Sequence, residues 1–304
     1  MTTRRQFLHT SLAASLASAL PLTAFAREKQ APLTVTALAD DLILIQGAGA
    51  NVVAARAADG AVLIDGGVER RSSELLKLVT KQTGTKRVAT LINTHWHPEQ
   101  TGSNLRLGKA GATIVAHVNT KLWLQRPIRV DWLDKPFGPV PKPAVPTETT
   151  YTTGKLQAGA HTLEYGYLPQ AHTDGDLYAY FREANVLVGG GVVSGDRWPL
   201  LDYQTGGWIG GLVGGIDRLL KVCDGETRIV PADGPVLTRA DLQAQRTMYF
   251  TIYDRLVKAL TKGLGPDEAA DTEPAKDLNP QWGNPRPFVL NAFKSMWGHF
   301  APDA

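Results

Sequence analysis

The chain has 304 residues, of which 43% are hydrophobic and 20% charged, the composition of an ordinary globular protein with ample material for a core. The formal net charge is +3, and Arg4 and Arg5 supply two of these charges within a predicted leader, so the remainder is close to neutral and nothing favours binding to nucleic acid or to an anionic membrane surface. The single cysteine, Cys223, excludes an internal disulfide and a zinc site built from cysteines.

The first residues have the pattern of a twin-arginine export signal. The arginine pair precedes an apolar stretch over residues 11–22, and Ala24-Phe25-Ala26 offers small side chains where a signal peptidase cleaves. We therefore expect a signal peptide over residues 1–26 and a mature domain over residues 27–304, exported to the periplasm by the twin-arginine machinery. The apolar stretch is short and interrupted by serine and proline, which argues against a stable membrane span.

The first half of the mature chain alternates short apolar runs with turn residues, which predicts a sheet. Strands are expected over residues 33–38, 42–46, 51–56, 61–64 and 88–93. Helical spacing predicts a helix over residues 68–83. A second helix is expected over residues 101–109, closed by Gly111 before a strand over residues 112–116.

The second half repeats this order of elements. Strands are expected over residues 162–168, 177–181, 186–188 and 228–230, and helices over residues 209–222 and 239–262. A stretch rich in proline and threonine, residues 136–153, is expected to be an extended surface loop, and the tail from Asn279 is expected to pack back on the body. Two similar halves of this kind predict an α+β fold with sheets inside and helices outside.

Three histidines stand in loops between predicted strands. His95 and His97 follow the apolar strand, and two residues apart at a strand end they project toward the same side. His172 lies in a turn between two further strands. A lone histidine is more often structural, but this pattern favours metal ligands. Three histidines and an open fourth position describe a catalytic zinc site, at which the metal activates water near neutral pH.

Six segments of the chain resemble the metallo-β-lactamase fold superfamily. They are Leu63-Ile64-Asp65-Gly66-Gly67, Ile92-Asn93-Thr94-His95-Trp96-His97, Ile114-Val115-Ala116-His117, His172-Thr173-Asp174-Gly175-Asp176, Asn185-Val186-Leu187-Val188-Gly189-Gly190 and Val230-Pro231-Ala232-Asp233-Gly234-Pro235-Val236. The resemblance implies a four-layer αββα metallo-β-lactamase-like sandwich with a metal site at one edge between the sheets. It also implies hydrolysis of a lactam, ester, thioester or phosphoester bond in a small-molecule substrate, and support of the metal ligands by hydrogen bonds from Asp65.

The resemblance implies that the three histidines form the first metal site, and it breaks down at the second. The four second-site positions hold Glu99, Gln100, Gly191 and Asp233. Members of the family have Asp and His at the first two of these positions, a bridging Asp at the third and a His at the fourth. Glutamine is a poor ligand for zinc and glycine offers no side chain, so the second site is altered throughout.

These substitutions leave three hypotheses open. In the first, the histidines hold one Zn²⁺ and Glu99 or Asp233 is the general base or proton shuttle of a hydrolase. In the second, the carboxylates of Glu99 and Asp233 help to hold a harder ion, Mn²⁺ or Fe²⁺, with Asp196 as a candidate for the missing bridging ligand. In the third, the chain is a catalytically weak or inactive relative that binds a ligand or a partner in the periplasm. Retention of all three histidines favours the first.

Other polar and aromatic residues have structural interpretations. His117 is expected to be structural, His161 exposed, and Asp174 and Asp176 turn-forming residues. Trp96, between the two ligands, is either a pocket wall or a residue packed beneath the loop. Two further tryptophans, at positions 198 and 208, flank a glycine-rich segment that is a candidate cover for the site.

Overall fold

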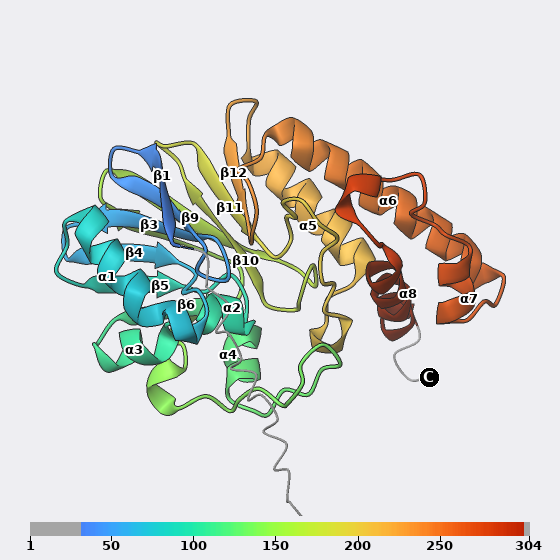
Figure 1. Ribbon diagram of the computed structural model, residues 1–304, viewed down its shortest axis with the longest axis horizontal. Helices are drawn as coiled ribbons and strands as arrows, with labels where there is room; N and C mark the ends of the chain where they lie inside the picture. Colours follow the sequence, from blue (N-terminus) through green and yellow to red (C-terminus); the bar gives the residue numbers. More distant parts are fainter. Residues whose placement is uncertain (1–31, 301–304) are drawn as a thin grey trace, which may run out of the picture. The chain divides into compact units, whose positions relative to one another are not determined.

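Two β-sheets face one another between outer helices in the computed structural model, which describes residues 32–300 (Figure 1). The predicted signal peptide and its cleavage site lie outside the described residues. Within residues 32–300, none of the helices combines the length and the apolar character that a membrane crossing requires.

The first sheet has seven strands in the order of the chain. They are β1 (Thr34–Ala39), β2 (Leu42–Gln46), β3 (Val52–Ala57), β4 (Gly60–Ile64), β5 (Val88–Ile92), β6 (Thr113–His117) and β7 (Glu148–Thr150). Strands β1 to β4 pair antiparallel and β4 to β7 pair parallel. Parallel neighbours need crossover connections. Here α1 (Ser72–Thr83) connects β4 to β5, and α3 (Asn104–Lys109) lies between β5 and β6.

The second sheet has five strands in the order β12-β11-β10-β9-β8. They are β8 (Thr153–Ala158), β9 (His161–Leu168), β10 (Asp176–Phe181), β11 (Val186–Gly190) and β12 (Arg228–Pro231). Only the β11–β12 pair is parallel, and α5 (Ile209–Val222) makes that crossover.

Three apolar cores join four layers. The core between the sheets includes Leu44, Ile64 and Phe181. A second core, with Leu75 of α1, lies on the outer side of the first sheet, and a third, with Leu212 of α5, lies on the outer side of the second. Every residue of β4 is buried, as expected for a strand covered on both faces. The predicted αββα sandwich is therefore confirmed.

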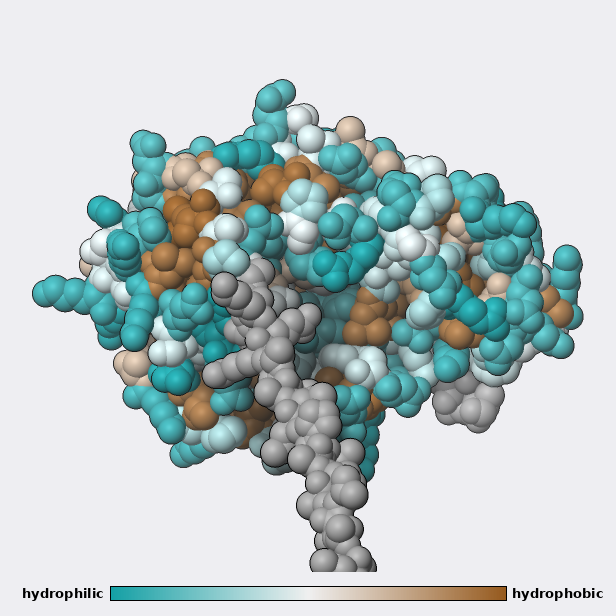
Figure 2. All heavy atoms as spheres, viewed as in Figure 1, coloured by the Kyte–Doolittle hydropathy of each residue, from teal (hydrophilic) through white to brown (hydrophobic). Residues whose placement is uncertain are grey.

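The C-terminal part of the chain is helical. It consists of α6 (Arg239–Thr261), α7 (Pro266–Asp271), the short turn η4 (Pro280–Trp282) and α8 (Arg286–Phe300). Thr238 and Asp241 form a capping box that starts α6. The tail does pack back as predicted, because Phe288 and Phe293 of α8 are buried in the same core as α5. Figure 2 shows a mainly hydrophilic surface over α6 and α7 on the face in view.

Several predicted boundaries differ from the structure. Residues 136–153 are not one loop, because they contain η2 (Lys142–Ala144) and β7, which completes the edge of the first sheet. The helix predicted over residues 101–109 is two helices, α2 (Pro98–Thr101) and α3. The break falls at Gly102, where a Cβ would lie 2.2 Å from the backbone nitrogen of Glu69. A further helix, α4 (Val118–Leu124), was not predicted from the sequence.

Candidate metal centre

The three predicted histidines meet at one edge of the sandwich. His95 and His97 lie in the loop between β5 and α2, and His172 lies in the turn between β9 and β10. A hydrogen bond from the backbone nitrogen of Leu177 to the carbonyl oxygen of Thr94 joins the two sheets at this edge. All three imidazoles are buried, and their facing nitrogens lie within 4.8 Å of one another. Among residues 32–300, they are the His, Cys, Asp and Glu side chains close enough together to share one ion.

Burial keeps two of these imidazoles neutral. It is the main reason why the pKa of His95 lies well below the usual value, and the nearby His97 and His172 lower it further. Burial followed by the proximity of His97 lowers the pKa of His172 to about 3. The Nδ1 of His97 faces the Nε2 of His172 at 3.4 Å. Neutral imidazole lone pairs that converge in this way are what a divalent cation requires, so the residues present fit a metal ion.

Asp65 supports this cluster through an intermediate residue. It follows β4 with a positive φ of 65°. Its carboxylate accepts hydrogen bonds from the backbone nitrogen of Thr94 at 2.8 Å and from the Thr94 hydroxyl at 2.8 Å. The same hydroxyl oxygen lies 3.0 Å from Nδ1 of His95. If the hydroxyl donates to Asp65, it can accept only from Nδ1–H, which leaves Nε2 of His95 free to bind a metal. Burial raises the pKa of Asp65 to about 7, against the effect of the Thr94 hydrogen bonds.

A second carboxylate, Asp202, orients His97. Its Oδ2 lies 3.0 Å from Nε2 of His97, so that Nδ1 is the nitrogen directed at the other histidines. The Thr205 hydroxyl also donates to Oδ2, at 2.5 Å, and in turn accepts from the indole of Trp96 at 3.0 Å. Burial raises the pKa of Asp202, but the hydrogen bond and charge of His97 outweigh it, and the pKa lies below the usual value.

Sequence reasoning missed Asp202. It lies 105 residues after His97 and belongs to none of the matching segments. A carboxylate at such a distance carries no local signal of its role. Only the folded loop that follows β11 brings it into contact with His97.

A cavity of about 430 Å³ opens over the histidines. All four altered second-site positions, Glu99, Gln100, Gly191 and Asp233, line it together with the three histidines. Its walls also include Trp132, Arg197 and Trp198. The fold therefore brings together the three histidines and the four second-site positions that the sequence singled out, whereas Asp65 is buried and does not line the cavity.

The second-site positions do not form a second cluster of ligands. A Cβ built on Gly191 would lie 2.2 Å from Cδ2 of His172, so the imidazole occupies the space that a side chain at 191 would need. Asp233 pairs with Arg197 at 3.3 Å, and burial raises the pKa of Asp233 while Arg197 lowers it. Asp196 is exposed, 3.5 Å from the same arginine, and does not line the cavity. The Glu99 carboxylate has no ion-pair or hydrogen-bond partner within residues 32–300.

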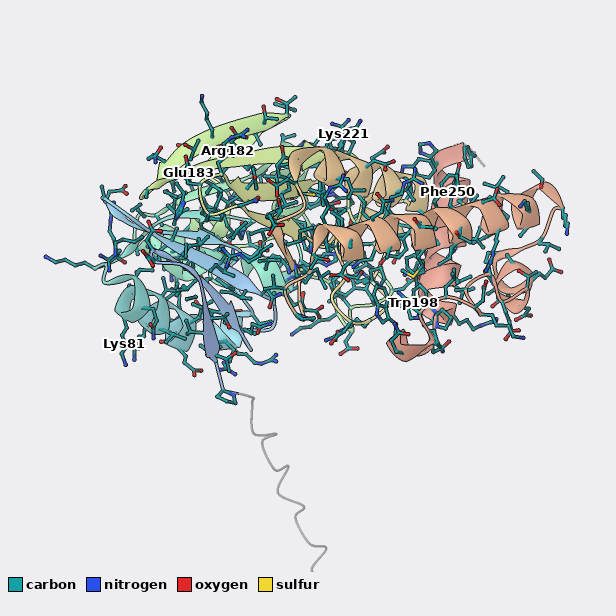
Figure 3. The ribbon with its side chains drawn as sticks, turned by 90° about the horizontal axis from the view of Figure 1, so that it is seen from above. Lys81, Arg182, Glu183, Trp198, Lys221 and Phe250 are labelled. Carbon is teal, nitrogen blue, oxygen red and sulfur yellow. The ribbon has the colours of Figure 1, made fainter. Side chains whose placement is uncertain are left out.

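The loop over the cavity is held by the C-terminal helices. The buried Ser194 donates its backbone N–H to Gln245 of α6 at 3.1 Å, and its hydroxyl lies 2.9 Å from that of Tyr249. Trp198 stacks on Phe288 of α8, with ring centroids 5.5 Å apart, and Figure 3 shows it alongside these helices. This loop forms one wall of the cavity, so α6 and α8 determine the shape of that wall.

Of the remaining predictions for aromatic residues and histidines, some agree with the structure and others do not. Trp96 is fully buried and packs beneath the loop, and Trp208 stacks on His299, with centroids 3.6 Å apart, rather than lining the cavity. His161 is not exposed as predicted, because its Nε2 pairs with Asp41 at 2.5 Å and the ring is buried at the start of β9.

The turn around His172 and the predicted structural role of His117 agree with the structure. Asp176 accepts from the backbone nitrogen of His172 at 2.7 Å, as expected of a turn residue. His117 caps α4 by accepting from the backbone nitrogen of Asn119. Cys223 is buried in the core around α5.

Comparison with known proteins gives the class. The sequence profile of the metallo-beta-lactamase superfamily matches residues 46–216, more than half of the chain. The chain therefore belongs to the metallo-beta-lactamase superfamily, and its histidine cluster is compatible with a metal site. No curated protein sequence matches it significantly.

Solved structures with the same fold include three metallo-beta-lactamases. The enzyme from Pontibacter korlensis is 20% identical, with a TM-score of 0.58 over 72% of this chain and 99% of that one. IND-7 is 18% identical, with a TM-score of 0.58 over 72% and 98%. FIM-1 from Pseudomonas aeruginosa, in its mono-zinc form, is 14% identical, with a TM-score of 0.56 over 73% and 96%. At these identities the likeness concerns the fold.

Proposed function

We propose that this protein is a metal-dependent hydrolase that binds one divalent ion, Zn²⁺ in the first place, at His95, His97 and His172. Its substrate would be a small molecule with a lactam, ester, thioester or similar bond. The main observation that supports this proposal is the convergence of three buried imidazoles at the floor of an open cavity, where burial keeps two of them neutral. An imidazole set of this kind suits zinc better than Mn²⁺ or Fe²⁺, which favour oxygen ligands.

The proposal of a single ion rests on the second-site residues. The imidazole of His172 fills the space beside Gly191, and Asp233 is engaged by Arg197. Neither Glu99 nor Asp233 belongs to the cluster of candidate ligands found within residues 32–300. FIM-1, a protein of the same fold, was solved in a mono-zinc form, so the fold itself accommodates one zinc ion.

A bound divalent ion would lower the pKa of a water ligand toward about 7 and polarise the bond to be cleaved. The chain's own residues would do the rest. Asp65, through Thr94, and Asp202 hold the imidazoles of His95 and His97 in one tautomer and orientation. Glu99, which has no competing partner within residues 32–300, is proposed as the general base that accepts a proton at its carboxylate. Asp233, neutralised by Arg197, is the second candidate.

The proposed location follows from the leader. We propose export by the twin-arginine route and cleavage near Ala26, on the strength of the arginine pair and the small residues before the cleavage site. The N-terminal sequence of protein recovered from a periplasmic fraction tests this, with Arg27 expected as the first residue. Protein that keeps Met1 in the cytoplasm would contradict it.

The deciding experiment is the metal content of the purified mature protein after loading with zinc. We expect one equivalent, lost in His95→Ala and retained in His299→Ala, a control that removes an exposed histidine stacked on Trp208 and outside the histidine cluster. Absence of metal under every loading condition would overturn the proposed function, and two equivalents would overturn the single-ion site. Metal retention without turnover across lactams, lactones, thioesters and phosphoesters would instead support the binding-protein hypothesis.

A further inference from the structure

A second cavity, of about 610 Å³, lies beside α2 and is larger than the cavity over the histidines. Its walls are mainly apolar and include Leu105, Leu124, Leu133, Phe137 and Val140. We call it the side cavity. Protein interiors are packed with few voids, so an apolar cavity of this size that opens to solvent has the character of a ligand site.

The side cavity is built on a small separate core behind the metal ligands. The fully buried Trp96, between His95 and His97, packs with Leu124 in this core. The segment after α4 supplies the outer part of the core and returns to η2 beside α3 (Figure 1). Leu133 and Phe137 from this segment pack on the core but stay only partly buried, because the cavity lies over them. The metal ligands and the side cavity therefore share one supporting structure.

The two cavities meet at α2. This helix is a single turn, and Glu99 on it lines both cavities. The adjacent residues Trp132 and Leu133 also lie between the two cavities. Trp132 lines the cavity over the histidines, which we call the metal cavity, and Leu133 lines the side cavity. The Trp132 ring lies 4.6 Å from that of His97. Glu99 and the Trp132–Leu133 pair therefore stand at the boundary between the two cavities, and a molecule that occupied both would cross this boundary.

We propose that the side cavity binds the apolar acyl group of the substrate while the hydrolysable bond lies at the three histidines. This inference rests on the proposed function. The charged residues that line the side cavity are Glu69, Glu99 and Arg70, and this excess of carboxylates disfavours an anion, so the group that crosses the boundary is a neutral ester, thioester or amide rather than a free carboxylate. The substrate class is accordingly an acyl derivative with an aliphatic chain of several carbons.

The test separates the two cavities by using two probes. Octanamide and acetamide, which differ only in the length of the apolar chain, are titrated calorimetrically into the metal-free protein. We expect affinity to rise on the order of threefold for each buried methylene group. Octanohydroxamate and acetohydroxamate are then titrated into the zinc-loaded protein. We expect the longer compound to bind more tightly by a similar factor, because its head group and chain are engaged together.

Two variants at Leu133 and one control show where the chain-length dependence arises. Leu133→Glu places a charge in the side cavity and is expected to abolish the chain-length dependence with both probes, while Leu122→Glu makes the same change at an exposed position of α4 outside both cavities and should leave it intact. Leu133→Trp fills part of the cavity without adding a charge. In this variant the affinity should stop rising at a shorter chain length than in the natural protein. A chain-length dependence that is absent from the natural protein, or that survives both changes at Leu133, would overturn the inference.

Different results would contradict the proposed metal site and the proposed role of the side cavity. If acetohydroxamate does not bind the zinc-treated protein, the metal site and the proposed function are wrong. If acetohydroxamate binds but the octyl chain adds nothing, the metal site stands and the side cavity is not the acyl site. If octanamide binds at Leu133 but octanohydroxamate gains nothing from its chain, the two cavities are not used by one molecule and the inference is overturned.

Discussion

The close approach of Gly191 and His172 bears on how many metal ions the site can hold. Gly191→Ala is expected to push the His172 imidazole out of position and to weaken zinc binding by about tenfold or more, because a displaced ligand loses its geometry. Competition with a chromophoric chelator measures this. Gly214→Ala is the control, since a Cβ there meets nothing within 4 Å. Unchanged affinity in Gly191→Ala would mean that the His172 imidazole can accommodate the added methyl group and still bind zinc.

The two carboxylates in the cavity are expected to differ in their effect on turnover. Glu99→Gln should lower kcat by about 10²- to 10⁴-fold and leave metal content unchanged, because it removes the proposed base but no ligand. Asp233→Asn should have a smaller effect, because that carboxylate is already paired with Arg197. Steady-state kinetics with the substrate found in the hydrolysis screen would decide between them. A larger loss in Asp233→Asn would reverse the assignment.

Asp202 is expected to act on the metal through His97. Asp202→Asn should weaken zinc binding on the order of 10- to 100-fold, because the amide cannot hold the imidazole in the required tautomer as a carboxylate does. Chelator competition, with Asp196→Asn as an exposed control on the same loop, measures it. If both variants bind zinc like the natural protein, Asp202 is only a packing residue.

Among the elements, α6, α7 and α8 lie beyond residue 216, where the match to the superfamily profile ends. They nevertheless hold the loop of Ser194 and Trp198 that forms a wall of the metal cavity. The helices of this part of the chain therefore act as a support for the site. Chains of the same superfamily that lack such helices would need another way to fix this loop.

Phe288 of α8 tests that support. Phe288→Ala should lower the free energy of unfolding by about 3–5 kcal/mol, because it removes a buried ring from the core and the surface on which Trp198 stacks. Phe250→Ala, at a ring that is 46% exposed on α6, should change it by no more than about 0.5 kcal/mol. Urea denaturation of both variants measures the difference. Equal stabilities would show that α8 does not belong to the core.

For the molecule as a whole, the buried histidines couple stability to pH. At His172, the unfolded chain binds more protons than the folded one between pH about 3 and 6.5, because the pKa of this imidazole falls from 6.5 to about 3 on folding. This histidine therefore makes the metal-free protein more stable as the pH rises through that window. Asp65 acts in the opposite sense, since its pKa is raised to about 7 and its contribution falls as the pH rises above the usual carboxyl value.

A variant without the His172 imidazole separates the contribution of this residue to the pH dependence of stability from that of the other groups. The free energy of unfolding of metal-free protein, measured between pH 4 and 6.5, should rise more steeply with pH in the natural protein than in His172→Gln, by at most about 1.4 kcal/mol per pH unit. His299→Gln should keep the natural slope, because that histidine is exposed. Parallel curves for the natural protein and His172→Gln would contradict the buried, neutral state of this imidazole.

The sequence alone determined the class of fold and singled out the three histidines that cluster in it. Apolar runs with period two or with helical spacing mark most strands and helices, because those elements arise from local contacts. The spacing of His95 and His97 after an apolar strand marks a site for the same local reason. The boundaries failed where the pairing partner was remote, as at β7 on the sheet edge, or where another segment approached, as at Gly102.

Tertiary structure decided how the site is completed. The support of His97 by Asp202, the contact of Gly191 with His172, and the side cavity across Glu99 all join segments that are far apart in the chain. Such contacts depend on how two sheets and the C-terminal helices pack, and packing leaves no periodic pattern in the residues that meet. The histidines and the altered second-site residues could therefore be predicted from the chain, whereas the contact of Gly191 with His172 and the side cavity could not.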